Sequence, residues 1–225
     1  EMKACVARGL KADGILSGGL GTRRKAKILY EQYVLNEDEE TRENRLVCAY
    51  AFAASEENAD GGRVVTAPTC GSCGVLPAVF CYLQQKNDIP DKIIVRALTT
   101  AGIIGNIVKT NASISGAQCG CQAEVGVACA MASAGIAELK NMNLDQIEYA
   151  AEVAIEHHLG LTCDPICGLV QIPCIERNAV AALRALNEVT LASFLADTRK
   201  ITFDTAVSTM YETGKDLGRG YRETA

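Results

Sequence analysis

The chain has 225 residues, of which 48% are hydrophobic and 22% are charged, a composition that excludes a disordered or fibrous protein. Its length predicts one large or two small domains with a sizeable core, and its net charge of −5 argues against binding to nucleic acid or to an anionic membrane surface. Tryptophan is absent and only 5% of the residues are aromatic, so we expect small side chains in the core and helices that approach closely.

Most of the chain has apolar residues at helical spacing. Threonine, proline and asparagine mark helix starts at Thr22, Pro90 and Asn143, and Leu144, Ile147, Ala151 and Ala154 predict one buried helix face. The expected helices cover residues 22–35, 46–54 after the acidic run 37–40, 74–85, 90–109, 121–140, 144–157, 174–195 and 202–217.

Only residues 63–66 have the character of a strand, and an α/β domain around that strand is the alternative. We predict an all-α fold in which residues 1–225 form a single helical domain without repeats. The chain begins and ends inside helix-like sequence, so we expect a fragment or a subunit of something larger.

Four segments between the helices combine glycine with hydroxyl or thiol side chains and carry little charge. Such loops are costly to order and bring backbone donors close to whatever they enclose. We expect the four to converge on one pocket; they are residues 14–21, 66–74, 110–121 and 161–168.

Eleven cysteines, an odd number, fit poorly with a secreted disulfide framework in a chain of this length. The N-terminus has no secretory h-region, and no apolar run reaches the roughly 18 residues that cross a bilayer. We therefore expect a cytoplasmic protein without a membrane partner, whose thiols are free to fill the core, bind metal or act in redox chemistry.

Two short cysteine pairs are ambiguous. Cys70 and Cys73 form a C-x-x-C pair, and Cys163 and Cys167 are four residues apart, so the four thiols could hold a structural zinc ion. The first pair could also be a redox pair, or could simply fill a glycine-rich turn. The remaining thiols in apolar helical runs are expected to be small buried hydrophobic residues, namely Cys5, Cys48, Cys81 and Cys129.

A second grouping is Cys121, Cys163 and Cys174, each within or directly after one of the unusual segments. Cys174 follows Pro173 at an expected helix start, where the helix dipole favours a thiolate. Three thiolates leave one corner of a cubic iron–sulfur cluster without a protein ligand, and an iron at that corner is a Lewis acid.

Six longer strings resemble the catalytic alpha portion of the iron–sulfur-dependent L-serine dehydratases. They run through most of the chain and are Thr-Ala-Pro-Thr-x-Gly from Thr66, Asn-Ala-Ser-Ile-Ser-Gly-Ala from Asn111, Gly-Cys-Gln-x-Glu-Val-Gly-Val-Ala-Cys from Gly120, Leu-Gly-Leu-Thr-Cys-Asp-Pro from Leu159, Pro-Cys-Ile-Glu-Arg-Asn-Ala from Pro173 and Met-Tyr-Glu-Thr-Gly-Lys-Asp from Met210.

The resemblance implies an all-helical catalytic domain, a 4Fe-4S cluster held by Cys121, Cys163 and Cys174, and conversion of L-serine to pyruvate and ammonia. It also implies a missing beta portion or subunit and a homo-oligomer. The chain departs from the family pattern at Cys70, where Asn is usual, and at Cys167, where a small residue such as Ala is expected.

Substrate residues are expected in the loops 66–74 and 111–116, whose backbone N–H groups and polar side chains suit a carboxylate and an ammonium group. The expected substrate contacts are Thr66, Thr69, Asn111, Ser113, Ser115 and Arg177. Abstraction of the α-proton needs a base, which the missing portion could equally supply. The candidates within this chain are His157, His158, Glu124 and Lys109.

Three rival interpretations remain open. A pyridoxal-phosphate dehydratase would need a Schiff-base lysine and a phosphate cup, and Ser17-Gly-Gly-Leu-Gly21 is a poor phosphate loop. A cluster-dependent L-cysteine desulfidase has the same residue types, and a zinc-stabilised scaffold without activity would use the two short cysteine pairs.

Overall fold

The computed structural model describes residues 1–222, and the all-α prediction is confirmed because this part of the chain contains helices and no strand. The α-helices are α1 (Met2–Gly9), α2 (Ala26–Glu31), α3 (Glu39–Ala59), α4 (Val75–Asn87), α5 (Asp91–Asn111), α6 (Gly116–Cys119), α7 (Val127–Leu139), α8 (Leu144–Glu156), α9 (Cys174–Leu195) and α10 (Phe203–Asp216). A π-helix, η1 (Gln122–Gly126), leads directly into α7, and short 3-10 turns are η2 (Ile166–Gly168), η3 (Ala196–Thr198) and η4 (Arg219–Tyr221).

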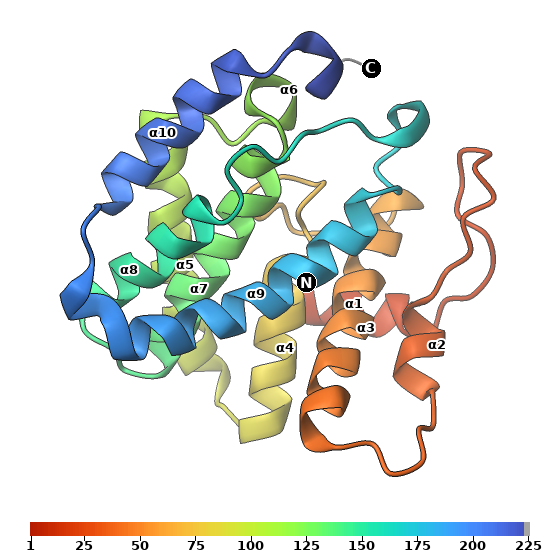
Figure 1. Ribbon diagram of the computed structural model, residues 1–225. Coiled ribbons are helices and arrows are strands. Elements are labelled where there is room, and N and C mark those ends of the chain that lie inside the picture. The colour runs from red at the N-terminus through yellow and green to blue at the C-terminus, as the bar shows by residue number, and fades with distance from the viewer. Residues whose placement is uncertain (223–225) are drawn as a thin grey trace.

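Helix α7 is the central element of the bundle, packed by α4, α5, α8 and α9 (Figure 1). Every residue from Val127 to Ala137 is buried, and most of them are alanine or glycine. Small side chains let the neighbouring helices come close: a Cβ on Gly135 would lie 2.5 Å from Phe80 Cζ and 3.0 Å from the carbonyl oxygen of Ala97. The expected core of small residues is therefore confirmed.

Helix α3 organises the N-terminal side of the molecule, where it packs against α1, α2, α4 and α9. Both sides share one continuous core of buried residues. At the edge of α3 a buried guanidinium, that of Arg24, pairs with Glu57 at 3.3 Å and with Asp60 at 2.8 Å. This pairing fixes the segment that precedes α2.

Helix starts agree with the sequence signals in three places. Pro90 is the N-cap of α5, and Asn143 forms a capping box at α8, accepting from the Gln146 N–H at 2.9 Å. Thr202 caps α10. The acidic run also lies early in a helix as expected, since Asp38 caps α3 and accepts from the Thr41 N–H at 2.8 Å.

Three local expectations are wrong. Thr22 does not start a helix, because residues 22–24 pair with residues 14–16 through an Ile15–Arg23 bridge and α2 begins only at Ala26. Residues 63–66 are not a strand, since no neighbouring strand pairs with them. Leu144 is 82% exposed although it belongs to the apolar stripe of α8, because it occupies the first position of the helix, beyond its packed face.

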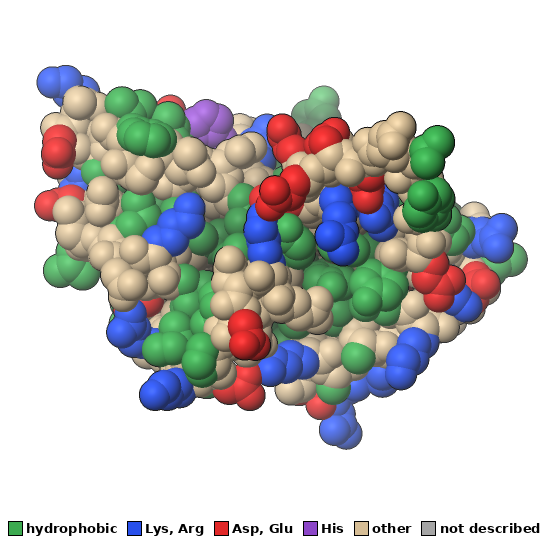
Figure 2. Space-filling model, turned by 90° about the horizontal axis from the view of Figure 1, so that it is seen from below, with side chains coloured by type: hydrophobic (Ala, Val, Ile, Leu, Met, Phe, Trp, Pro, Cys, Tyr) green, Lys and Arg blue, Asp and Glu red, His purple; other side chains and the backbone are tan. Residues whose placement is uncertain are grey.

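Two helical stretches, α5 and residues 174–198, are long and apolar enough to cross a membrane by length and composition. Both pack against α7 in this bundle, and core helices of globular proteins meet the same criterion. Figure 2 shows charged side chains of both signs spread over one face of the molecule, with apolar areas between them.

Candidate functional site

The π-helix η1 brings the side chains of Cys121 and Glu124 close together. Cys121 is its N-cap residue and Glu124 lies in its only turn. The sulfur of Cys121, a carboxylate oxygen of Glu124 and the sulfur of Cys163 all lie within 4.8 Å of one another. Wider π-type turns inside α-helices recur at functional sites, because they shift the side chains around the turn. We call these three side chains the thiol–carboxylate cluster.

Cys163 reaches this cluster through the loop that follows α8. The loop is held on both sides: the Cys163 N–H donates to the Tyr221 carbonyl at 2.9 Å, and the Gly160 N–H donates to Gln122 Oε1 at 2.9 Å. The Gln122 amide also donates to the Met210 carbonyl of α10 at 2.9 Å. The buried Gln122 therefore joins three segments that are distant in the sequence.

Cys174 lies at the first position of α9 and is 7% exposed. It stands outside the tightest group, but it is close enough to Cys121 and Glu124 for their negative charges to act on its thiol. Three thiols on three converging segments therefore suit an iron–sulfur cluster, for which cysteine thiolates are the usual ligands.

The surroundings shift the pKa values of these thiols in opposite directions. A hydrogen bond with Cys163 lowers the pKa of Cys121 despite its burial, and the guanidinium of Arg177 acts in the same sense. Burial raises the pKa of Cys174 to about 12, with the charges of Cys121 and Glu124 adding to the effect. Of these two thiols, Cys121 therefore loses its proton more readily. Cys174 needs a nearby cation, such as a bound metal, to stabilise its thiolate.

The loop 66–74 closes over Glu124. The Thr69 hydroxyl donates to Glu124 Oε1, and a Cβ on Gly71 would lie 2.6 Å from the same oxygen. A Cβ on Gly116, from the next polar loop, would lie 2.9 Å from both Cys163 Sγ and Glu124 Oε2. Only glycine allows the two loops to approach the cluster this closely.

Asn178 of α9 fixes the loop 66–74 to the helix that carries Cys174. Its side-chain amide donates to the carbonyls of Gly71 at 2.7 Å and Cys174 at 2.9 Å, and its oxygen accepts from the Gly74 N–H at 2.9 Å. Asn178 is fully buried. This residue was not singled out from the sequence. The signal that could have found it is a polar side chain on the apolar face of an expected helix, which indicates a buried hydrogen-bonding role.

Three of the four polar segments meet at the cluster. The fourth, residues 14–21, packs against another part of the chain: the Gln171 amide donates to the Ser17 carbonyl at 2.6 Å, and a Cβ on Gly18 would lie 2.7 Å from Leu169 Cδ1. Residues 14–21 therefore support the loop before Cys174 and do not line the cluster.

The expected substrate residues differ in position. Thr69 contacts Glu124. Arg177 lowers the pKa of Cys121, and its guanidinium lies 4.0 Å from the Asp164 carboxylate. Ser113 is buried within its own loop, where its hydroxyl donates to Gln118 and accepts from the Ser115 N–H. Thr66 and Asn111 are exposed, and the Asn111 amide donates to Ile107 of its own helix.

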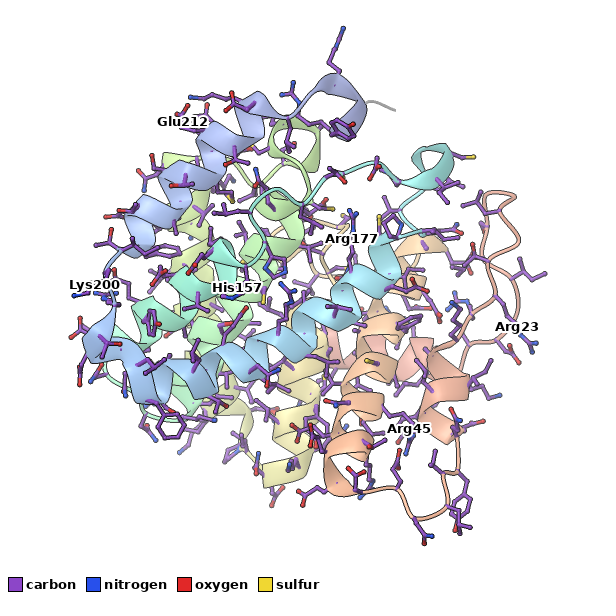
Figure 3. All side chains as sticks on the ribbon, viewed as in Figure 1. Arg23, Arg45, His157, Arg177, Lys200 and Glu212 are labelled. Carbon is purple, nitrogen blue, oxygen red and sulfur yellow. The ribbon has the colours of Figure 1, made fainter. Side chains whose placement is uncertain are left out.

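The two histidines do not belong to the thiol–carboxylate cluster. His157 is exposed beside α9, while Arg177 lies near the start of that helix (Figure 3). His158 is buried with Cys129 and Glu188, each offering a ligand atom within 4.8 Å of the others. Cys129, expected to be a small hydrophobic residue, is therefore part of a polar cluster. Lys109 is exposed on the last turn of α5.

The remaining thiols are scattered, and all eleven cysteines are free. Cys70 and Cys167 are exposed and Cys73 is buried. Among residues 1–222, no group of three metal-type ligands includes any of these three. The four-thiol zinc scaffold therefore has no support in this geometry. Cys5 and Cys81 are buried as expected, and Cys48 is partly exposed.

Comparison with known proteins defines the class. The family model described as serine dehydratase alpha chain matches residues 1–225. The chain belongs to this family.

Individual relatives give the next level of detail. The chain is 49% identical to the L-serine dehydratase of Haemophilus influenzae (strain ATCC 51907 / DSM 11121 / KW20 / Rd), and the alignment covers 100% of this chain and 50% of that protein. It is 47% identical to L-serine dehydratase 1 of Escherichia coli (strain K12), with the same coverage, and 48% identical to the L-serine dehydratase of Mycobacterium tuberculosis (strain CDC 1551 / Oshkosh), again over 100% and 50%. The chain therefore spans about half the length of the curated relatives it matches.

Proposed function

We propose that the chain is the catalytic half of an L-serine ammonia-lyase that releases pyruvate and ammonia. The observation that carries this proposal is the meeting of Cys121, Cys163 and Glu124 within 4.8 Å, with Cys174 beside them. The family membership and the relatives' names point to the same reaction. In this proposal residues 1–225 form one alpha-type catalytic domain.

The proposed cofactor is a 4Fe-4S cluster held by Cys121, Cys163 and Cys174. The donor set fits, because three thiols approach from three separate segments and the pKa of Cys121 is already lowered. When bound, such a cluster supplies an iron with an open coordination position, a Lewis acid toward the substrate hydroxyl. A pyridoxal-phosphate mechanism would leave these thiols without a role.

Within this chain, Glu124 is the best-placed proton acceptor. Its carboxylate lies next to two of the proposed ligands and is oriented by the Thr69 hydroxyl. His157 is exposed and His158 lies in a different buried cluster, so neither histidine shares this position. We propose that Glu124 removes the α-proton of the substrate or orients the group that does so.

Arg177 is the proposed partner of the substrate carboxylate. Its guanidinium is partly buried next to Cys121, and a fork of N–H donors matches a carboxylate. The loops 66–74 and 111–116 also reach this site, since Thr69 and Gly116 lie against Glu124. These loops would hold the amino acid in one orientation and exclude water from it.

The half of the relatives' length that this chain does not cover is the proposed beta portion, as a separate subunit or as part of a longer chain. We expect full activity to require it, and we expect a homo-oligomer. Eleven free cysteines support a reducing compartment, in agreement with the expected cytoplasmic location.

The proposal is tested by Cys163→Ser against Cys81→Ser, in protein purified without oxygen. Cys81 is also buried, but in apolar surroundings on α4. We expect Cys163→Ser to lose the brown colour, the acid-labile sulfide and pyruvate formation, measured after the beta portion is added. Cys81→Ser is expected to keep all three. Equal effects of the two substitutions would contradict the ligand assignment.

The substrate is tested on the same anaerobic protein with L-serine, L-threonine and L-cysteine. Pyruvate formed chiefly from L-serine supports the dehydratase. Sulfide released chiefly from L-cysteine would favour the desulfidase.

A further inference from the structure

A second cluster of potential metal ligands lies away from the proposed iron–sulfur site. It consists of Cys129 on α7, His158 in the turn after α8 and Glu188 on α9, which we call the buried triad. Cys129 is 0% exposed, and His158 and Glu188 are each 6% exposed. Three helical segments thus contribute one soft, one borderline and one hard donor to a single point in the core.

The side chains of the buried triad are already oriented toward one another. Cys129 Sγ lies 3.2 Å from Glu188 Oε2, and the Ser133 hydroxyl donates to the same oxygen at 3.0 Å. All three ligand atoms lie within 4.8 Å. A tetrahedral zinc ion holds sulfur, nitrogen and oxygen ligands about 3.3–3.6 Å apart, so on binding the Cys129 and Glu188 atoms would separate slightly, and no pair of ligand atoms would close by more than about 1.5 Å.

The histidine has the hydrogen bond that is typical of a metal ligand. Its Nδ1 lies 2.7 Å from the Ala154 carbonyl, which can only accept, so Nδ1 carries the proton and Nε2 keeps its lone pair. A backbone carbonyl on the far nitrogen fixes both the tautomer and the ring orientation of metal-binding histidines. The ring also packs against Gly126, where a Cβ would lie 2.8 Å from His158 Cβ.

From these contacts we infer that the buried triad is a binding site for a divalent zinc-type cation. A thiolate and a carboxylate together carry two negative charges, which a divalent ion neutralises, and a neutral site is the form that a buried position accepts. The mixed sulfur, nitrogen and oxygen donors suit zinc better than magnesium or calcium, which prefer oxygen alone. The Ser133 hydroxyl, which donates to Glu188 Oε2, would hold that carboxylate in place beside the ion.

The ion would act on structure rather than on the reaction. Helix α7 continues from the π-helix that begins after Cys121, His158 precedes Cys163 in the same loop, and α9 begins at Cys174. An ion that joins these three elements in the core would therefore help to hold the three proposed cluster ligands in fixed positions relative to one another. His158 also lines a cavity of about 440 Å³, together with Arg184 and Val125, so an ion that entered from this cavity would meet His158 first.

The experiment measures zinc and iron in the complete chain, purified without oxygen and without chelators and then incubated with a zinc salt. We expect about one tightly held zinc ion per chain. Cys129→Ser and His158→Gln should lose it, and Cys81→Ser should keep it. Cys163→Ser should keep the zinc while it loses iron and sulfide, which separates this site from the proposed cluster.

A second measurement guards against loss of zinc through misfolding. Each variant is compared with the wild type by circular dichroism, and cobalt replaces zinc in the wild type, where a thiolate-to-cobalt charge-transfer band should appear. That band should be absent in folded His158→Gln or Cys129→Ser protein. Wild-type protein without zinc, or zinc that survives in Cys129→Ser but not in Cys163→Ser, overturns the inference.

Discussion

The most informative stability test is the replacement of Asn178 by alanine. The Asn178 side chain makes three hydrogen bonds, two to the loop 66–74 and one to the first turn of α9. In Asn178→Ala the Gly74 N–H and the Gly71 carbonyl lose their partner. Asn178 is fully buried and Gly74 is buried too, so the lost bonds are not readily replaced by water.

The magnitude follows from the number of unpaired groups. Each buried donor or acceptor left without a partner costs about 1–3 kcal/mol, so two of them lower the free energy of unfolding by about 2–6 kcal/mol. Asn178→Asp keeps the acceptor for the Gly74 N–H but loses both donated bonds. We therefore expect it also to destabilise the protein, since it adds a buried negative charge near the thiols.

The assay is urea unfolding followed by far-ultraviolet circular dichroism. The matched control is Asn87→Ala, because Asn87 is exposed and makes one hydrogen bond, to Leu83 at 3.1 Å. We expect the control to change the free energy of unfolding by less than about 1 kcal/mol. If Asn178→Ala were as mild as the control, the Asn178 side chain would not be what holds the loop 66–74 to α9.

Three further predictions test separate parts of the fold. Burial raises the pKa of Glu152 to about 7 from its ordinary 4.5, so the stability that its protonated form contributes is present below about pH 4.5 and is lost as the pH rises toward 7. Glu152→Gln should match the wild type at pH 4 and exceed its free energy of unfolding by up to about 3 kcal/mol at pH 8, and equal gains at both pH values would contradict this. Gly135→Ala should destabilise by about 1–3 kcal/mol in the same urea assay because its Cβ meets Phe80, whereas Gly102→Ala, with open space around it, should stabilise by about 0.5–1 kcal/mol; similar effects would refute the close helix contact. Asn143→Ala should lower the melting temperature through loss of about 1 kcal/mol at the capping box of α8, and an unchanged melting temperature would show that the cap is dispensable.

Helices with strong local signals were the predictable part of the fold. The expected range 174–195 coincides with α9. The expected ranges for α8 and α10 differ from the observed helices by no more than one residue at either end. Local signals failed where a tertiary contact decided the conformation. Arg24 pairs with Glu57 on α3 and with Asp60 directly after that helix, and this pairing shortens the helix that was expected from Thr22. For helix α1 the sequence indicated only helix-like character at the start of the chain, without bounds, because its few apolar residues are buried only against α3 and α4.

The candidate site was predictable in its thiols but not in its supporting residues. Spacing and motif context singled out Cys121, Cys163 and Cys174, and Glu124 was on the list of candidate bases. The positions of the two histidines were not predictable, because adjacent residues at the end of α8 point in different directions: His157 toward solvent and His158 toward Cys129 and Glu188. A sequence gives the spacing of such residues but not the helix against which each one packs.

The sequence alone determined the helical class of the protein, the small-residue core and the three cysteines that we propose as cluster ligands, because periodicity, composition and motif spacing are local properties of the chain. The tertiary structure decided which polar groups meet. Three loops close on Glu124, while Glu188 and His158 meet Cys129 from two other helical segments. These encounters depend on how helices pack around α7, and packing depends on all of the chain at once.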